Sequence, residues 1–165
     1  MTKSITSANS VLTITATSRE IATTVSGSTG SDAIGALSGL LGVPVTLQGW
    51  AADQAFSIDR QNTAEVVLGV DGQMHTGWVP SLVPLNVSLM PDSDSQDYME
   101  EIFTIQKEMR EVLLITGVLI IPALNKKYAL SNGVLNGYTP IPSHNRVMAA
   151  QGSTITFQTI TPAAY

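Results

Sequence analysis

Apolar and polar residues alternate in several short segments of the chain, a pattern typical of β-strands with one buried face. Residues 83–89 (VPLNVSL) place four apolar side chains on one face and Asn86 and Ser88 on the other. Residues 153–160 (STITFQTI) alternate in the same way, and residues 11–17 (VLTITAT) are rich in residues that favour strands. These segments therefore predict strands of an antiparallel sheet.

Turn residues divide the remaining apolar segments. Residues 64–70 (AEVVLGV) lead into Asp71-Gly72, a dipeptide that favours a type I′ hairpin turn, so we expect a return strand over about residues 73–79. Residues 45–50 (VTLQGW) are a further candidate strand.

The segment 112–121 is almost continuously apolar, which predicts a strand buried on both faces. Asn132-Gly133 and Asn136-Gly137 predict two tight turns, with a short strand or a loop between them.

One helix is expected, because apolar residues recur at three- and four-residue spacing within residues 97–110. Asp94 precedes Asp97 by three residues, which resembles a capping box with Asp in place of Glu or Gln; Ser95 is an alternative N-cap. Acidic residues at its start and basic residues near its end complement the helix dipole. The fold class expected is mainly β, an antiparallel barrel or sandwich with one flanking helix at about 94–110, in a single domain over residues 1–165.

Five carboxylates within residues 92–101 raise the question of a metal site. Asp92 and Asp94 match the start of an EF-hand loop, but Gln96 and Asp97 stand where that loop needs its third oxygen ligand and its glycine. We therefore predict a helix start here, and neither a metal site nor a cofactor.

Composition narrows the function classes. Only 13% of the residues are charged, below the usual fraction of about a quarter, and a weakly charged polar surface fits a chain that meets copies of itself. The formal net charge of −5 argues against a protein that grips nucleic-acid phosphates. The chain has no cysteine, which excludes disulfides. Its N-terminus does not resemble a signal peptide and its apolar runs are too short to span a bilayer, so we expect production in a cytoplasm and no membrane partner.

No catalytic residue is assigned, and we expect the protein not to be an enzyme. The sequence contains neither a Gly-x-Ser-x-Gly elbow nor a His-Glu-x-x-His motif, and residues 26–42, with five glycines, match no phosphate-binding loop. A small hydrolase that uses His75 or His144 is the catalytic alternative. We expect residues 26–42 to form a long loop with one helical turn at about 33–41.

The order of these features resembles the tail tube proteins of contractile-tailed bacteriophages, in the tail-tube/Hcp-like superfamily. The resemblance rests on the Gly69-x-Asp71-Gly72 hairpin and on a strand-to-helix junction with Leu89, Ser93, Ser95 and Asp97 at matching places. It implies a barrel or sandwich with a flanking helix, which forms stacked, hexameric rings around a channel for DNA in the virion tail. It also implies self-association, contacts with sheath and baseplate or terminator proteins, passage of DNA without specific binding, and assembly in the host cytoplasm.

Two related roles stay open beside a tube subunit: a tube-like terminator, initiator or baseplate ring protein, and a decoration or binding module of the virion. On the resemblance, residues on polar strand faces are candidates for the channel lining: Asp59, Glu65, Asn86 and Ser88. Residues of the glycine-rich segment are candidates for contact with another ring or subunit: Gly30, Asp32, Gly35, Leu37, Leu40 and Leu41.

Overall fold

The computed structural model describes residues 9–18 and 39–164. These residues form an antiparallel, mainly β structure with one long helix, α2 (Asp94–Met109), as the residue pattern predicted. A short 3₁₀ helix, η1 (Pro122–Leu124), connects two strands. The strands are β1 (Val11–Thr17), β2 (Pro44–Thr46), β3 (Phe56–Ile58), β4 (Ala64–Leu68), β5 (Met74–Trp78), β6 (Val83–Leu89), β7 (Leu114–Ile121), β8 (Lys126–Tyr138) and β9 (Gln151–Ala164).

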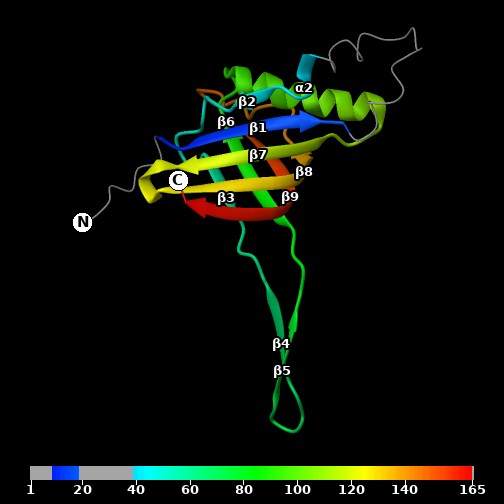
Figure 1. The fold of residues 1–165 in the computed structure, drawn as a ribbon. Coiled ribbons are helices and arrows are strands. Elements are labelled where there is room, and N and C mark those ends of the chain that lie inside the picture. The colour runs from blue at the N-terminus through cyan, green and yellow to red at the C-terminus, as the bar shows by residue number, and fades with distance from the viewer. Residues whose placement is uncertain (1–8, 19–38, 165) are drawn as a thin grey trace.

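Seven strands form one sheet in the order β2-β1-β7-β8-β9-β6-β3, and β4 and β5 form a separate pair. The long strands β8 and β9 pair with each other over most of their length, whereas β6 pairs only with residues 151–157 of β9. Figure 1 shows β6 and β3 crossing behind β1 and β7 at an angle. The sheet therefore curls into two layers, and β8 and β9 run through both.

Bulges allow β8 to curl, and they replace the two tight turns predicted at Asn132-Gly133 and Asn136-Gly137. Asn132 has a left-handed φ of 51°, and the β8–β9 register shifts between Leu135 and Gly137. A Cβ at Gly133 would overlap the Phe157 ring, so this position of the bent strand requires glycine. The turn prediction was wrong because the same backbone freedom that closes a hairpin also forms a bulge inside a continuous strand.

Strand β7 is buried on one face, not on both as predicted. Ile115 and Leu119 are buried, but Val118 on the other face is 40% exposed. In this antiparallel sheet the apolar run therefore leaves part of its second face to solvent.

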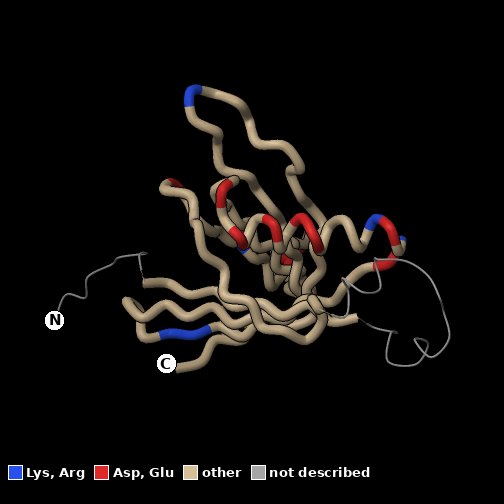
Figure 2. The backbone as a smooth tube through the Cα atoms, turned by 90° about the horizontal axis from the view of Figure 1, so that it is seen from above, with Lys and Arg blue, Asp and Glu red and all other residues tan. Residues whose placement is uncertain are grey.

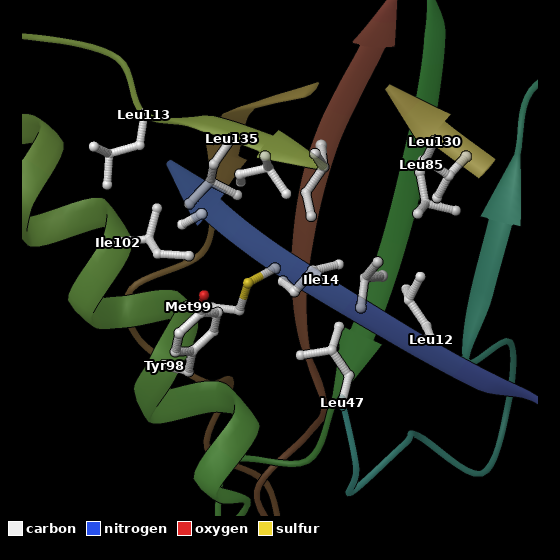
Figure 3. Packing of buried hydrophobic residues seen from close by; sticks show 14 of the residues in the cluster. Leu12, Ile14, Leu47, Leu85, Tyr98, Met99, Ile102, Leu113, Leu130 and Leu135 are labelled. Carbon is white, nitrogen blue, oxygen red and sulfur yellow. The ribbon is translucent and has the colours of Figure 1, made fainter. Parts of the chain in front are cut away.

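Helix α2 closes one end of the core (Figure 3). Leu12 and Ile14 of β1 meet Leu85 of β6 in the shared interior of the two layers. The expected helical stripe is confirmed, because Tyr98, Ile102 and Ile105 are buried against this interior and the partly buried Met109 packs against it. Met99 is buried beside them. Within residues 9–18 and 39–164, no helix is long and apolar enough to cross a membrane.

Candidate assembly surface

The β4–β5 hairpin projects away from the seven-stranded sheet (Figure 1). Gly69 N donates to Gln73 O at 2.8 Å, and Gly72 N donates to Gly69 O at 2.9 Å. Gly72 has a φ of +76°, but Asp71 does not take a left-handed conformation. The predicted hairpin is confirmed, but its turn is a three-residue loop that ends in a glycine bulge, not a type I′ turn.

One face of this hairpin is apolar and uncovered. Ala64 pairs with Trp78, Val66 with Thr76 and Leu68 with Met74, so these side chains share a face. The exposed fractions are 58% for Val66, 72% for Leu68, 67% for Met74 and 78% for Trp78. A lone two-stranded hairpin is marginally stable in water, and an exposed apolar patch of this kind marks an interaction site.

The opposite face of the hairpin is mixed. It carries Glu65 beside Val67 and His75, all of them exposed. Asp59 is also exposed and lies directly after β3, where the chain leaves the sheet.

Asn86 and Ser88 lie together on the outer face of β6, half-buried. Thr154 of β9 donates from its hydroxyl to Asn86 Oδ1 at 2.9 Å, which orients the amide. The four candidate channel residues therefore do not form one cluster: Asn86 and Ser88 share an uncharged polar strand face, and Glu65 stands apart on the hairpin. Their place in a channel stays a prediction.

Two of the six candidate contact residues in the glycine-rich segment lie within the described part of the chain. Leu40 is buried in the core and Leu41 packs against it, so both contact the interior of their own chain. Gly39 and Leu40 are helical, as expected for the end of this segment. Gly30, Asp32, Gly35 and Leu37 lie outside the described residues.

The helix begins at Asp94 as predicted, but its N-cap is Ser93. Ser93 has an extended backbone, and its Oγ accepts a hydrogen bond from Gln96 N at 3.2 Å. Asp94 and Asp97 occupy the first turn instead, where their charge faces the positive end of the helix dipole. The Ser-x-x-Gln spacing of a capping box was present in the sequence and is the signal that identifies Ser93.

The same serines fasten the helix to the segment that follows β2. Ser95 Oγ accepts from Gln48 N at 2.8 Å, and Ser93 Oγ donates to Gln48 O at 3.3 Å. Gly49 has a φ of +72°, and a Cβ there would overlap the side chain of Ser93. The junction that resembled the tail tube pattern therefore holds α2, by hydrogen bonds, against the segment that follows β2.

Acidic residues predominate along α2, whose last turn carries Lys107 with Arg110 at its C-terminal end (Figure 2). Acidic side chains follow the exposed side of α2, where Asp97, Glu100, Glu101 and Glu108 lie. The adjacent pair Lys126 and Lys127 begins β8, apart from this helix. Separated charges of this kind favour oriented docking of a partner more than they add affinity.

Two tyrosines near the helix stay neutral at physiological pH. Burial, followed by the charge of Glu101, raises the pKa of Tyr98 above its ordinary value of 10.0. Burial, followed by the charge of Glu100, also raises the pKa of Tyr138, whose hydroxyl accepts from Gln96 Nε2 at 3.2 Å.

The two histidines lie on separate exposed segments. His75 is on the hairpin, and Nδ1 of His144 lies 2.9 Å from Pro142 O in the loop before β9. In the described part of the chain, no three His, Cys, Asp or Glu side chains are placed to share a metal ion.

Comparison with known proteins gives one family match. A family model described as tail fiber protein gp32 matches residues 23–161. Among solved structures, a chain of the anti-feeding prophage baseplate, a 6-fold symmetrised cryo-EM structure, has a TM-score of 0.53 at 10% identity over 99% of this chain and 98% of that chain. A chain of the sheath/tube terminator of an extracellular contractile injection system, in its extended state, has a TM-score of 0.46 at 12% identity, with 93% of both chains covered. No curated protein sequence matches significantly.

Proposed function

We propose that this chain, which belongs to the tail fiber protein gp32 family, is a non-catalytic structural protein that assembles with copies of itself in a phage tail. The family match confirms the relation to phage tails that the sequence predicted. The more specific prediction, that the subunits form stacked hexameric rings around a DNA channel, is part of this proposal.

The observation that carries the proposal is the uncovered apolar face of the β4–β5 hairpin. Val66, Leu68, Met74 and Trp78 each expose more than half of their surface. Fully burying such side chains contributes about 1.5–3 kcal/mol each, so an assembly that covers them gains a large driving force. The free edges of β4 and β5 add backbone groups that are also ready to pair.

A ring role is supported by the shared fold with a baseplate chain of the anti-feeding prophage, whose structure is described as 6-fold symmetrised. The outer face of β6, with Asn86 and Ser88, suits a channel wall because it offers no positive charge to phosphates. The acidic side of α2 would then be available to sheath, baseplate or terminator proteins.

A second candidate is a tail-fibre or decoration module, which the description of the matched family favours. Such a module would form trimers or remain a monomer, and would keep an exposed face for a ligand. The oligomeric state therefore separates the two candidates.

The test uses the purified full chain, with light scattering after size exclusion and negative-stain microscopy over a range of concentrations. We expect rings or tubes for the wild type. Val66→Asp should prevent assembly, because Val66 lies on the apolar face of the hairpin. Val67→Asp is the matched control: Val67 is a neighbouring valine with 56% exposure on the opposite face, and this variant should assemble.

Monodisperse monomers of the wild type at high concentration would exclude self-assembly by this chain alone. Discrete trimers without rings would favour the tail-fibre candidate. Equal loss of assembly in both valine variants would show that the apolar face has no special role.

A further inference from the structure

An apolar groove of about 320 Å³ lies between β3 and the ends of β7, β8 and β9. Six apolar or aromatic side chains contribute to its lining: Phe56, Ile58, Leu119, Ile121, Tyr128 and Ile160.

A free strand edge borders this groove. The pairing between β6 and β9 ends at Val83 and Phe157, and β9 continues to Ala164. Along residues 158–164, β9 is paired with β8 on one side, and no described strand pairs with its other side. Ile160 belongs to this free stretch and also lines the groove. Pro162 has no backbone N–H to donate, so the part of this edge that can pair is residues 158–161. A free edge beside an apolar floor is the combination that accepts an added strand.

The loop of the hairpin is acidic, and a lysine lies near the groove. Residues 61–82 contain Glu65 and Asp71 and no lysine or arginine. Lys126 lies two residues before Tyr128 on the regular part of β8, so both side chains lie on the same face of the sheet. Glu65 lies on the hairpin face opposite the apolar one, so Asp71 in the hairpin loop is the carboxylate that can approach this lysine when the apolar face enters the groove.

No residue of the hairpin lines the groove of its own chain. In its own chain the hairpin is joined to the end of β3 by residues 59–63 and to the start of β6 by residues 79–82. From there it runs away from the sheet, and its apolar face remains exposed (Figure 1). Both the hairpin and the groove are thus uncovered in one chain, and one contact between copies covers both.

We propose that the hairpin of one copy adds as a strand along residues 158–161 of β9 in the next copy and lays its apolar face into the groove. This inference rests on the proposed self-assembly and names the two surfaces that meet. The contact is head-to-tail, so repeating it closes a ring or extends a stack, according to the rotation between copies.

A mixing experiment tests the pairing of the two surfaces. The hairpin variant Val66→Asp keeps an intact groove, and the groove variant Ile160→Asp keeps an intact hairpin. Each variant should be monomeric alone. An equimolar mixture should form a 1:1 complex, because the intact hairpin of the groove variant can bind the intact groove of the hairpin variant. Ile58→Asp on β3, where the side chain is 36% exposed, repeats the test at a site that tolerates a charge better. Circular dichroism of each variant checks that it is folded.

The outcomes separate this inference from the proposed function. A monomeric wild type would overturn both. Wild-type assembly that Val66→Asp abolishes but folded groove variants retain would overturn only the inference. A mixture that stays monomeric would overturn it as well.

Disulfide trapping gives an independent test of the contact. The natural chain has no cysteine, so only the introduced cysteines can form disulfides. The double variant Leu68→Cys/Ile160→Cys should give a ladder of linked chains on a non-reducing gel, extending beyond the dimer. Val67→Cys/Ile160→Cys, with its cysteine on the other hairpin face, should give at least several-fold less. A dimer as the only product, formed equally by Leu68→Cys alone, would indicate hairpin-to-hairpin contact and overturn the proposal.

Discussion

Replacing Ser93 by alanine removes the hydroxyl that caps α2 and joins it to the neighbouring segment. The lost acceptor served Gln96 N at 3.2 Å, and the lost donor served Gln48 O at 3.3 Å. Loss of a serine N-cap typically costs about 1 kcal/mol, and a hydrogen bond contributes about 0.5–1.5 kcal/mol net. Because Ser93 is only half-buried and water can replace part of the second bond, we expect a total loss of about 1–2 kcal/mol.

The matched comparison is Asp94→Ala. Asp94 is exposed in the first turn, and its removal costs only the dipole interaction, about 0.3–1 kcal/mol. For a domain of this size, each kcal/mol shifts Tm by about 2–4 °C, so Ser93→Ala should lower Tm by about 2–8 °C.

Thermal unfolding at low protein concentration, followed by circular dichroism, measures both variants. Ser93→Asp should retain most of the stability, because aspartate is also a good N-cap. If Asp94→Ala were as destabilising as Ser93→Ala, the assignment of Ser93 as the cap would be refuted.

Three further predictions concern the core. Gly133→Ala should destabilise the fold by about 1–3 kcal/mol through overlap with the Phe157 ring, whereas Gly152→Ala, with open space around it, should be nearly neutral in the same urea titration. Ile102→Ala should cost about 2–5 kcal/mol because the side chain is fully buried, and a urea midpoint unchanged from the wild type would contradict the packing of α2. Because the pKa of Tyr98 is raised above 10.0 in the folded chain, the stability that its neutral form provides is complete below pH 10 and is lost as the pH rises above 10. Urea unfolding at pH 9 and pH 11 should therefore show a smaller alkaline loss for Tyr98→Phe than for the wild type.

Strands with one covered face were predictable from the sequence. Residues 83–89 alternate because the apolar set faces a closed core, and a shift by one residue would bury Asn86 and Ser88 instead. The bend of β8 was not predictable, because Asn132-Gly133 is equally suited to a turn and to a bulge. The pairing of β8 with β9, which is a tertiary contact, decides that a bulge forms here and not a turn.

The candidate surface was only partly predictable for a related reason. Asp71-Gly72 identified the hairpin, but cross-strand pairing decides which side chains share a face, and Val66 and Val67 are alike in sequence. That the apolar face is uncovered depends on where the hairpin points, which no local pattern specifies. Ser93 was detectable from its spacing to Gln96, but Asp94 and Asp97 have the same spacing and so offer a competing capping box.

The anchorage of the hairpin has a mechanical consequence. The chain returns from the hairpin through residues 79–82 into β6, which is held by seven residue pairs with β9, from Val83–Phe157 to Leu89–Gln151. Figure 1 shows the hairpin leaving the sheet roughly in line with β6, so a pull on it acts along the strand, across the direction of the hydrogen bonds. The whole ladder must then slip at once instead of opening one bond at a time. Because β9 also pairs with β8, a force applied to the hairpin is passed to the strands of the other layer.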